Sequence, residues 1–334
     1  MDSHTFDEVE LKILQALEID GRAPFSRIAE VVGVSDQTVA RRYRKLVASG
    51  GLRVVGLQDS HLLGHDTWML RLRCAPEGAE TIATALARRP DTAWIGLTSG
   101  GTEVVCITVP RTPGDHDDLL LGKLPRTPHI VEIRALQMLH RYFGGPQGWL
   151  RKHGLLTPDQ VEALRPPPPT AEPALPTQDD APLLAVLKRD GRATYPELQR
   201  ATGTSESAVK RRLAQLLASG ACYVDIEYDT TRLGYGLAAV LWITAAPRHL
   251  HAVGRALADH QEIAYAAATA GPSNIVVTAV ARDTADLYAY VSGKLGHLKG
   301  VEHVETAPFS RRVKQLTYNP AKGRGERREQ PRRT

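Results

Sequence analysis

The chain has 334 residues, of which 42% are apolar and 24% are charged, a composition typical of a folded protein with several domains. No apolar run approaches the roughly 18 residues of a membrane-spanning helix, no secretory signal opens the chain, and three widely spaced cysteines favour a reduced, cytoplasmic protein. The net charge of +5 comes almost entirely from residues 321–334, which hold six basic and two acidic residues, so overall charge does not by itself indicate nucleic-acid binding.

Three helices are predicted before residue 50. Apolar residues at helical spacing predict the first helix from Phe6, and the turn 20–22 ends it, with Gly21 suited to a left-handed backbone. A second helix is predicted over 25–32, and Ser35 is a suitable N-cap for a third helix that runs to about residue 48. The residues that follow predict a short strand, which would begin a wing.

The third helix is predicted to have two unlike faces. Val39, Tyr43 and Leu46 form an apolar stripe, and the opposite face is polar and basic. A helix that buries one face and offers the other to the major groove indicates a helix-turn-helix. The predicted DNA contacts of this unit, to base edges or to phosphates, are Ser35, Gln37, Thr38, Arg41, Arg42, Arg44, Lys45 and Arg53.

The next part of the chain alternates strands and helices. Strands are predicted at 67–72, 93–97, 104–109 and 130–136, and helices at 78–88 and 117–123. This βαββαβ order is the ferredoxin-like arrangement. A turn over 98–102 joins the two middle strands.

The whole unit occurs twice. Asp20-Gly21-Arg22-Ala23 recurs 170 residues later, and 13 of the 31 positions from Asp20 to Gly50 are identical at that offset. A match of this length predicts a tandem duplication. The second helix-turn-helix places its predicted DNA contacts at Ser205, Ser207, Lys210, Arg211 and Arg212. Consecutive prolines at 166–169 indicate a spacer between the copies.

The motifs of the first copy resemble the Lrp/AsnC family of bacterial regulators. The resemblance rests on Ile13-Leu14, Asp20-Gly21-Arg22, Gly33-Val34-Ser35, Arg41-Arg42 and the run from Leu46 to Gly50. It implies a transcriptional regulator that binds double-stranded DNA and is modulated by a small molecule, an amino acid or a related metabolite. It also implies a ferredoxin-like effector domain after each helix-turn-helix.

In the resembled family the effector lies near the turn between the middle strands, where a glycine is followed by an acid. Here the turns read Gly100-Gly101-Thr102-Glu103 and Gly271-Pro272-Ser273-Asn274, so the glycines are present and the acid directly after them is not. Ordinary turn composition explains these residues about equally well. The candidate effector contacts are Thr98, Ser99, Gly100, Gly101, Thr102, Thr269, Gly271, Ser273 and Asn274.

The predicted fold class is α+β, with two winged helix-turn-helix domains alternating with two ferredoxin-like βαββαβ domains. The predicted boundaries are 1–58 and 59–145 for the first copy, 146–178 for a Pro-rich linker, 179–229 and 230–319 for the second copy, and 320–334 for a basic, disordered tail. The open face of each sheet must be covered, so the two copies are predicted to pair as an intramolecular pseudo-dimer. Further assembly into homo-oligomers is left open.

The two copies are not equal as readers of DNA. The second recognition helix is less basic, and Asp225, Glu227 and Asp229 follow it on the second wing, where they would repel phosphates. The first helix-turn-helix is therefore predicted to contribute most of the affinity. Because the two helices differ in their outward residues, the operator is predicted to be asymmetric.

Two alternatives remain open. Siroheme decarboxylases resemble paired Lrp/AsnC units, which makes a fused enzyme of that type the rival, although their His-Asn-Tyr stretch is replaced here by Trp94-Ile95-Gly96-Leu97. A protein-binding module that has lost DNA contact is the other alternative. No catalytic residue, metal ligand set or cofactor motif is predicted, and His61 and His65 are expected to be surface histidines.

Overall fold

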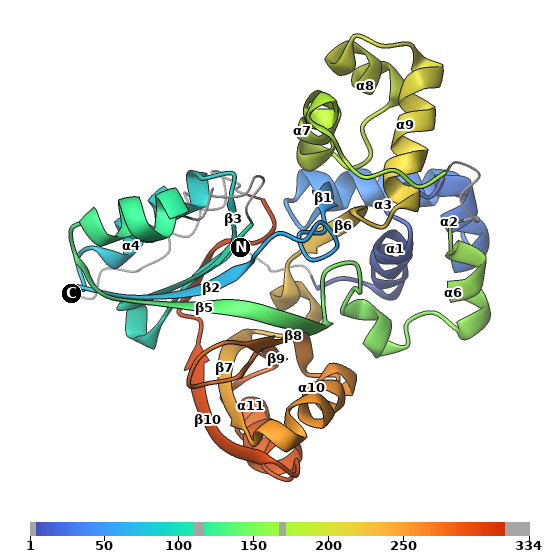
Figure 1. The fold of residues 1–334 in the computed structure, drawn as a ribbon. Coiled ribbons are helices and arrows are strands. Elements are labelled where there is room, and N and C mark those ends of the chain that lie inside the picture. The colour runs from blue at the N-terminus through green and yellow to red at the C-terminus, as the bar shows by residue number, and fades with distance from the viewer. Residues whose placement is uncertain (1–4, 110–116, 167–171, 318–334) are drawn as a thin grey trace, which may run out of the picture.

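The computed structural model describes residues 5–109, 117–166 and 172–317. It contains two three-helix heads and two ferredoxin-like domains (Figure 1), which confirms the predicted fold class. The predicted basic tail at 320–334 lies outside the described residues. Within the described ranges, no helix is long and apolar enough to cross a membrane.

The first head consists of α1 (Glu8–Ile19), α2 (Phe25–Val32) and α3 (Asp36–Ala48). Asp7 caps α1 by accepting the backbone N–H of Glu10 at 2.9 Å, and the Glu10 carboxylate accepts the backbone N–H of Asp7 in return. Ser35 caps α3 as predicted, because its Oγ accepts the backbone N–H of Thr38 at 3.2 Å. The second head repeats the pattern with α7 (Ala181–Arg189), α8 (Tyr195–Thr202) and α9 (Glu206–Ala218).

The strand that follows each head does not form a wing within its own copy. Strand β1 (Leu52–Gln58) pairs antiparallel with β6 (Cys222–Tyr228) of the other copy, from Leu52 opposite Tyr228 to Gln58 opposite Cys222. The two strands form a ribbon that joins the heads. Because each strand pairs with a strand of the other copy, the backbone groups along the paired edge form their hydrogen bonds across the pseudo-dimer.

The repeated Asp-Gly-Arg turns meet across the ribbon. Arg22 donates to the carbonyls of Gly191 and Ala193 at 2.6 and 3.0 Å. Arg192 makes the reciprocal bonds to the carbonyls of Gly21 and Ala23 at 2.8 and 2.9 Å. The most similar segment of the two copies is therefore the one through which the heads hold each other.

The glycine of this turn is required for a different reason from the one predicted. Gly21 does not have a positive φ, so the left-handed prediction is wrong. A Cβ at Gly21 would lie 2.4 Å from Cγ1 of Val224 on β6, and a Cβ at Gly191 would lie 2.9 Å from the same atom. Both glycines allow the turns to approach the ribbon closely.

The two ferredoxin-like domains have the predicted order. The first contains β2 (Trp68–Cys74), α4 (Ala79–Arg88), β3 (Thr92–Thr98), β4 (Glu103–Thr108), a helical turn at Asp118–Lys123 and β5 (Ile130–Phe143). The second contains β7 (Leu237–Ala245), α10 (Leu250–Asp259), β8 (Ile263–Thr269), β9 (Ile275–Ala281), α11 (Thr284–Tyr290) and β10 (Val301–Pro308). Their strands lie in the orders β5-β2-β4-β3 and β10-β7-β9-β8.

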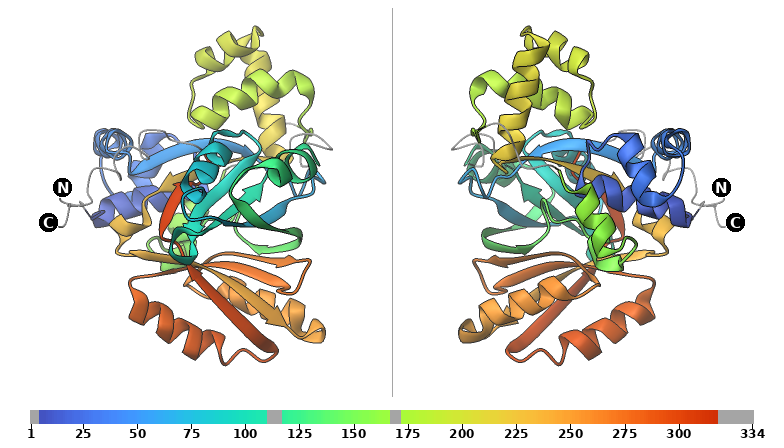
Figure 2. Two further views of the ribbon diagram at one scale, coloured as in Figure 1. Left: turned by 90° about the vertical axis from the view of Figure 1, so that its left-hand side faces the viewer. Right: turned by 90° about the vertical axis from the view of Figure 1, so that its right-hand side faces the viewer.

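The two domains pair within the chain, as predicted. The end of β5 pairs with β8, and β11 (Arg311–Lys314) pairs with β3. Each copy thus extends its last strand onto the other copy, which gives one nine-stranded sheet. Met69, Val105 and Trp242 pack in a buried cluster between the two domains, while α10 and α11 cover the outer face of the second domain (Figure 2).

Part of the segment predicted as a linker, 146–178, is folded. It contains α6 (Pro158–Leu164), and Leu150, Leu156 and Leu164 are buried in the core of the first head. Arg27 donates to the carbonyl of Ala163 at 2.9 Å. Apolar residues placed between the domain and the prolines therefore complete the first head.

Candidate nucleic-acid interface and inner cavity

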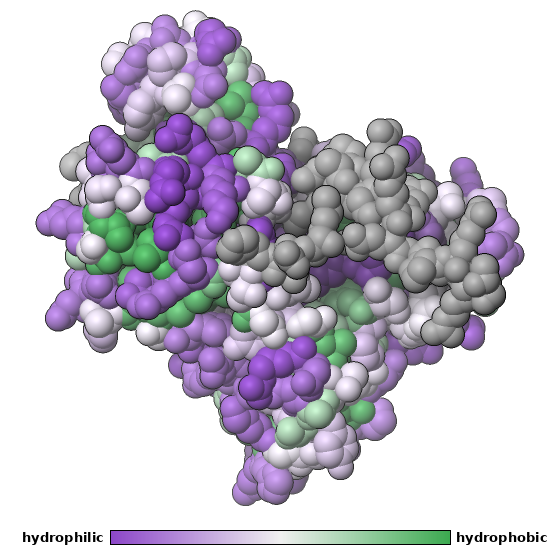
Figure 3. Space-filling view, turned by 180° about the vertical axis from the view of Figure 1, so that it is seen from behind, coloured by the Kyte–Doolittle hydropathy of each residue, from purple (hydrophilic) through white to green (hydrophobic). Residues whose placement is uncertain are grey.

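The recognition helix α3 presents a basic, solvent-exposed face. Its apolar residues Val39 and Leu46 are buried, whereas Arg41, Arg44 and Lys45 are exposed. Gln37 is exposed beside them near the N-terminus of the helix. Strongly hydrophilic side chains form a band over the first head, at the left of Figure 3. Four of the predicted DNA contacts therefore lie where a major groove could be read.

The hydroxyls of Ser35 and Thr38 are already engaged. They lie 2.9 Å apart, and Ser35 also caps the helix. A serine that caps the recognition helix holds its first turn in place and leaves the N–H groups at that end directed outward. Ser35 and Thr38 are therefore better placed to orient α3 than to read bases.

Arg42 has partners inside the first head. Its guanidinium forms ion pairs with Asp7 and, at 3.6 Å, with Glu10, which is only 3% exposed. Lys45 also reaches Glu10 at 3.4 Å. Arg42 therefore joins the start of α1 to the middle of α3.

Arg53 likewise has partners away from the recognition face. It lies on β1, where it forms an ion pair with Glu227 of β6 at 3.2 Å and donates to the hydroxyl of Thr317. Sequence periodicity placed both Arg42 and Arg53 near the recognition helix, and did not show that acidic partners neutralise them.

The second recognition helix exposes fewer free basic groups. Arg212 pairs with Asp180 at 2.6 Å in the position that matches Arg42. Lys210 pairs with Glu206 at 2.6 Å on its own helix. Arg211 is exposed, and the hydroxyls of the two predicted serine contacts, Ser205 and Ser207, lie 3.1 Å apart.

The acids that follow the second head do not project as a wing. Asp225 and Glu227 lie on β6 of the ribbon and line an inner cavity, and Asp229 caps a short helical turn by accepting the N–H of Thr231 at 3.0 Å. Repulsion of phosphates by these three acids, expected from the sequence, therefore does not follow from this structure. The prediction that the second head binds DNA more weakly therefore depends on the side chains of α9.

The turns predicted to bind an effector use most of their polar groups internally. The Thr98 and Ser99 hydroxyls donate to Glu103 at 2.9 and 3.3 Å. The Asn274 side chain makes two hydrogen bonds with the backbone of Ala245, at 2.9 and 2.8 Å. In addition, Thr102 donates to Ser99, Thr269 donates to Ser273, and Gly100, Gly101 and Gly271 have positive φ.

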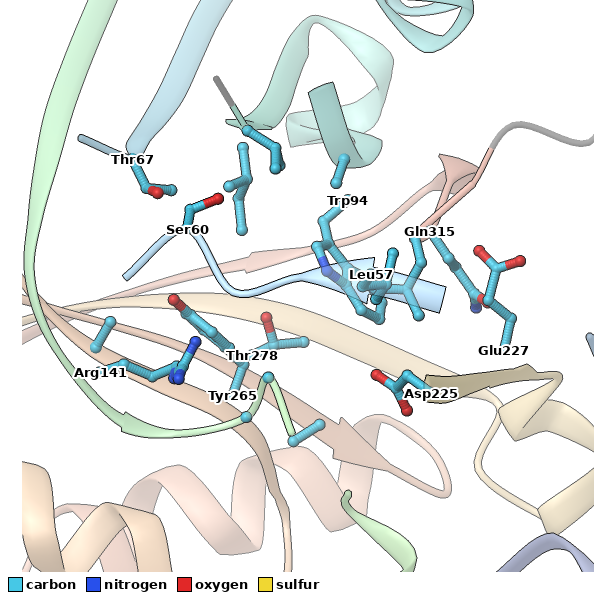
Figure 4. Close-up of a pocket in the computed structure, with 18 of the residues that line it drawn as sticks. Leu57, Ser60, Thr67, Trp94, Arg141, Asp225, Glu227, Tyr265, Thr278 and Gln315 are labelled. Atoms are coloured by element: carbon cyan, nitrogen blue, oxygen red, sulfur yellow. The ribbon is translucent and has the colours of Figure 1, made fainter. Parts of the chain in front are cut away.

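A cavity of about 280 Å³ lies between the ribbon and the two ferredoxin-like domains (Figure 4). The candidate effector residues at the two turns do not line it. Its wall includes Leu57 of β1, Trp94 of β3, Arg141 of β5, Asp225 of β6 and Tyr265 of β8. Sequence analysis missed this site, because its wall draws on both copies and no local pattern joins these residues.

The histidines predicted to lie on the surface, His61 and His65, also belong to the cavity wall, together with His140. Desolvation lowers the pKa of His140, and the nearby His251 lowers it further. Across the described ranges, no group of three or more histidine, cysteine, aspartate or glutamate side chains is placed to hold a metal ion.

One end of the cavity is rich in carboxyl groups. Desolvation raises the pKa of Asp225 to about 7, and the charge of Glu227 adds to this effect. Desolvation raises the pKa of Glu18 to about 8, and the charge of Asp225 contributes. Glu18 accepts the backbone N–H groups of Leu150 and Arg151, both at 3.2 Å. At neutral pH Glu18 is therefore mostly protonated and Asp225 is partly protonated, unlike ordinary surface carboxyls.

Two basic groups of the wall have protein partners. Asp59 holds Arg141 by two hydrogen bonds of 3.1 and 2.6 Å. Lys314 donates to the carbonyl of Arg89 at 2.7 Å, and desolvation lowers its pKa to about 8.

Family models match three parts of the chain. The AsnC-type helix-turn-helix domain matches residues 6–47 and 178–217, and the Lrp/AsnC ligand binding domain matches residues 238–318. The two helix-turn-helix matches fall on the two heads, and the third match falls on the second ferredoxin-like domain.

Curated relatives match one copy at a time. The HTH-type transcriptional regulator LrpA of Pyrococcus horikoshii is 28% identical over 133 residues, which are 40% of this chain and 94% of LrpA. The HTH-type transcriptional regulator FL11 of the same organism is 30% identical over 101 residues, which are 30% of this chain and 67% of FL11.

Among solved structures, the siroheme decarboxylase NirDL shares the fold over nearly the whole chain. It superposes with a TM-score of 0.63 at 15% identity, covering 93% of this chain and 94% of NirDL. Its complex with an iron-uroporphyrin III analogue gives a TM-score of 0.61 at 14% identity, covering 93% of this chain and 94% of that one. At this level of identity the likeness shows the fold alone.

Proposed function

The chain belongs to the Lrp/AsnC family, and we propose that it is a sequence-specific, DNA-binding transcriptional regulator whose affinity for its operator depends on a small-molecule effector. One observation carries this proposal. Recognition helix α3 is capped and packed, yet Gln37, Arg41, Arg44 and Lys45 remain exposed on one face. A helix that only filled a structural role would not need an uncovered basic face. Such a regulator would act on chromosomal DNA in the cytoplasm.

The two heads form one DNA-reading unit. The Arg22 and Arg192 exchange and the β1–β6 ribbon hold them together. A pair of recognition helices in such a unit reads two half-sites, about 34–36 Å or a multiple apart on one side of the duplex. The outward residues differ between α3 and α9, so the two half-sites are expected to differ in sequence.

The test is binding to DNA from upstream of the protein's own gene, measured by fluorescence anisotropy over a salt series. The double variant Arg41→Ala/Arg44→Ala removes two exposed charges, and Arg255→Ala removes one exposed charge from α10 as a control. The wild type should bind specifically, and the double variant should lose affinity and about two units of the salt slope. Equal, sequence-blind binding by wild type and double variant would refute the proposal.

The contribution of the second head is tested in the same assay. Arg211 is the exposed counterpart of Arg41, while its neighbours Lys210 and Arg212 are held in ion pairs. Arg211→Ala should therefore weaken binding less than Arg41→Ala. Equal losses would show that both heads contribute alike.

A siroheme decarboxylase-like enzyme is the second candidate. It is favoured by the full-length fold likeness to NirDL and by the presence of a cavity between the two copies. A multiply carboxylated tetrapyrrole would require several free basic groups, whereas Arg141 is bound to Asp59 and carboxyls occupy one end of the cavity. Absorbance spectra recorded on mixing the full chain with iron-uroporphyrin III test this candidate. Saturable spectral shifts that Arg141→Ala abolishes would favour the enzyme.

A further inference from the structure

The cavity has an aromatic wall with an unusual backbone. Trp94 has a φ of +52°, its backbone N–H donates to the carbonyl of Gln315 at 2.8 Å, and its side chain is 43% exposed. A left-handed backbone at a bulky residue costs on the order of 1–3 kcal/mol and persists only where the surroundings impose it. Here it turns an indole toward the cavity, opposite Tyr265 (Figure 4).

The other determinant is the acidic end of the cavity. Glu18, Asp225 and Glu227 all line it. Glu227 has an ion pair with Arg53 at 3.2 Å. Within the described ranges Asp225 has no ion-pair partner, and its hydrogen bond comes from the backbone N–H of Ile226 at 2.7 Å.

The basic side chains nearby do not offset Asp225. Arg141 forms an ion pair with Asp59, and the carboxylate whose charge acts on Arg312 is that of Asp229. A cation placed against Asp225 would therefore satisfy a carboxylate that the protein leaves without a counter-ion.

We propose that this cavity binds a planar aromatic amine, whose ring lies against Trp94 and whose ammonium group pairs with Asp225, and that its binding changes the affinity of the heads for DNA. The volume of about 280 Å³ lies just below the usual range of small-molecule sites, roughly 300–1,000 Å³, which suits a ligand of few rings. The regulatory half of this inference rests on the proposed function. The binding half does not.

Strand β6 provides the route to the heads. Five of its residues line the cavity, namely Tyr223, Asp225, Ile226, Glu227 and Tyr228, whereas Val224 does not. Between them Val224 approaches both Gly21 and Gly191, the glycines of the turns that lock the heads together. A ligand that displaces Asp225 must therefore displace Val224 against those turns.

The binding test uses tryptamine as probe and indole-3-propionate as its matched anionic control, with the full-length protein and isothermal titration calorimetry. Tryptamine should bind saturably, and indole-3-propionate should bind at least tenfold more weakly. Asp225→Asn should weaken tryptamine roughly tenfold or more, since it removes a charged hydrogen-bond partner. Trp94→Ala should also weaken it. Glu302→Gln, the same change at an exposed position of β10, should leave the affinity unaltered.

Each outcome decides the inference. Absence of saturable tryptamine binding at millimolar concentration, tighter binding of indole-3-propionate, or unchanged affinity in both Asp225→Asn and Trp94→Ala overturns it. Thermal unfolding of each variant checks that it is folded, and Trp94→Phe, which keeps a ring, should retain intermediate affinity. A folded Asp225→Asn protein that binds as the wild type does would suffice to reject the proposed ammonium contact.

The proposed effect of the ligand on DNA binding is tested by fluorescence anisotropy with the upstream DNA, measured with and without tryptamine. The midpoint of DNA binding should shift about fivefold or more, the lower range of allosteric coupling, and Asp225→Asn should abolish the shift. A protein that binds tryptamine but no DNA would refute the proposed regulator and leave the ligand site standing. A protein that binds DNA with an unchanged midpoint while tryptamine occupies the cavity would overturn the coupling through β6.

Discussion

The reciprocal arginines at the centre of the ribbon should be strongly stabilising. Arg192→Ala removes two charged hydrogen bonds, to the carbonyls of Gly21 and Ala23, and the contact of the guanidinium with the Phe25 ring, whose centroid is 4.6 Å away. Both glycine and alanine are buried, so their carbonyls lose a donor that water replaces poorly. Bonds to charged groups contribute about 1.5–3 kcal/mol each, and partial solvent exposure reduces this sum. The expected cost is about 3 kcal/mol.

Urea unfolding followed by circular dichroism measures this cost. Arg192→Ala should lower the midpoint by about 1 M, given slopes of a few kcal/mol per molar. Arg22→Ala should lower the free energy of unfolding by a similar amount. The double variant should lose less than the sum of the two single losses, because removal of one arginine already weakens the hydrogen bonds of the other. Arg255→Ala on α10 is the control, since its side chain is exposed. A change below about 0.5 kcal/mol for Arg192→Ala would refute the role assigned to the exchange, because ordinary surface substitutions cost that much.

Three further outcomes are expected. The free energy of unfolding should fall as pH rises from about 5 to 8, because Glu18 keeps its proton up to about pH 8 in the folded protein but not in the unfolded chain. The fall is at most about 1.4 kcal/mol per pH unit for each titrating group. In urea titrations at several pH values, Glu18→Gln should make this pH dependence weaker. Arg42→Ala should lower the thermal stability by about 1–2 kcal/mol, because the ion pair with Asp7 is lost. An unchanged melting temperature would contradict this structural role and would favour Arg42 as a DNA contact. Gly21→Ala should cost about 1–3 kcal/mol through its clash with Val224, and Val224→Ala should recover part of it in a double-mutant cycle.

Much of the fold could be predicted from local patterns. The helices of the heads follow from apolar spacing and from caps such as Ser35, and both features act within a few residues of the chain. The βαββαβ order follows from alternation and turn residues in the same way. The duplication strengthened both predictions, because one pattern had to hold twice.

What sequence reasoning missed lies between the copies. The sequence predicts the start of a wing at residues 52–55 because the partner strand, 222–228, stands far away in the sequence. The same limit applies to Arg42 and Arg53, since their basic character can be read locally and their acidic partners cannot. The folded part of the linker could not be predicted for the same reason, because its apolar residues Leu150, Leu156 and Leu164 pack in the core of the first head, which stands far away in the sequence.

Fusion of the copies gives the cavity a property that a symmetric dimer could not have. The counterpart of Asp225 is Val55, at the offset of 170 residues, and the counterpart of Trp94 is Tyr265, because β3 and β8 match at an offset of 171. In a dimer of identical copies, each feature of a site on the two-fold axis would occur twice, so the site would carry two carboxylates at symmetric positions. Here each copy contributes one aromatic ring to the cavity wall, but Asp225 has no acidic counterpart, so the cavity offers a single, directional site. Binding of one ligand per chain is therefore the stoichiometry that the geometry requires, and its orientation is set by which copy carries the acid.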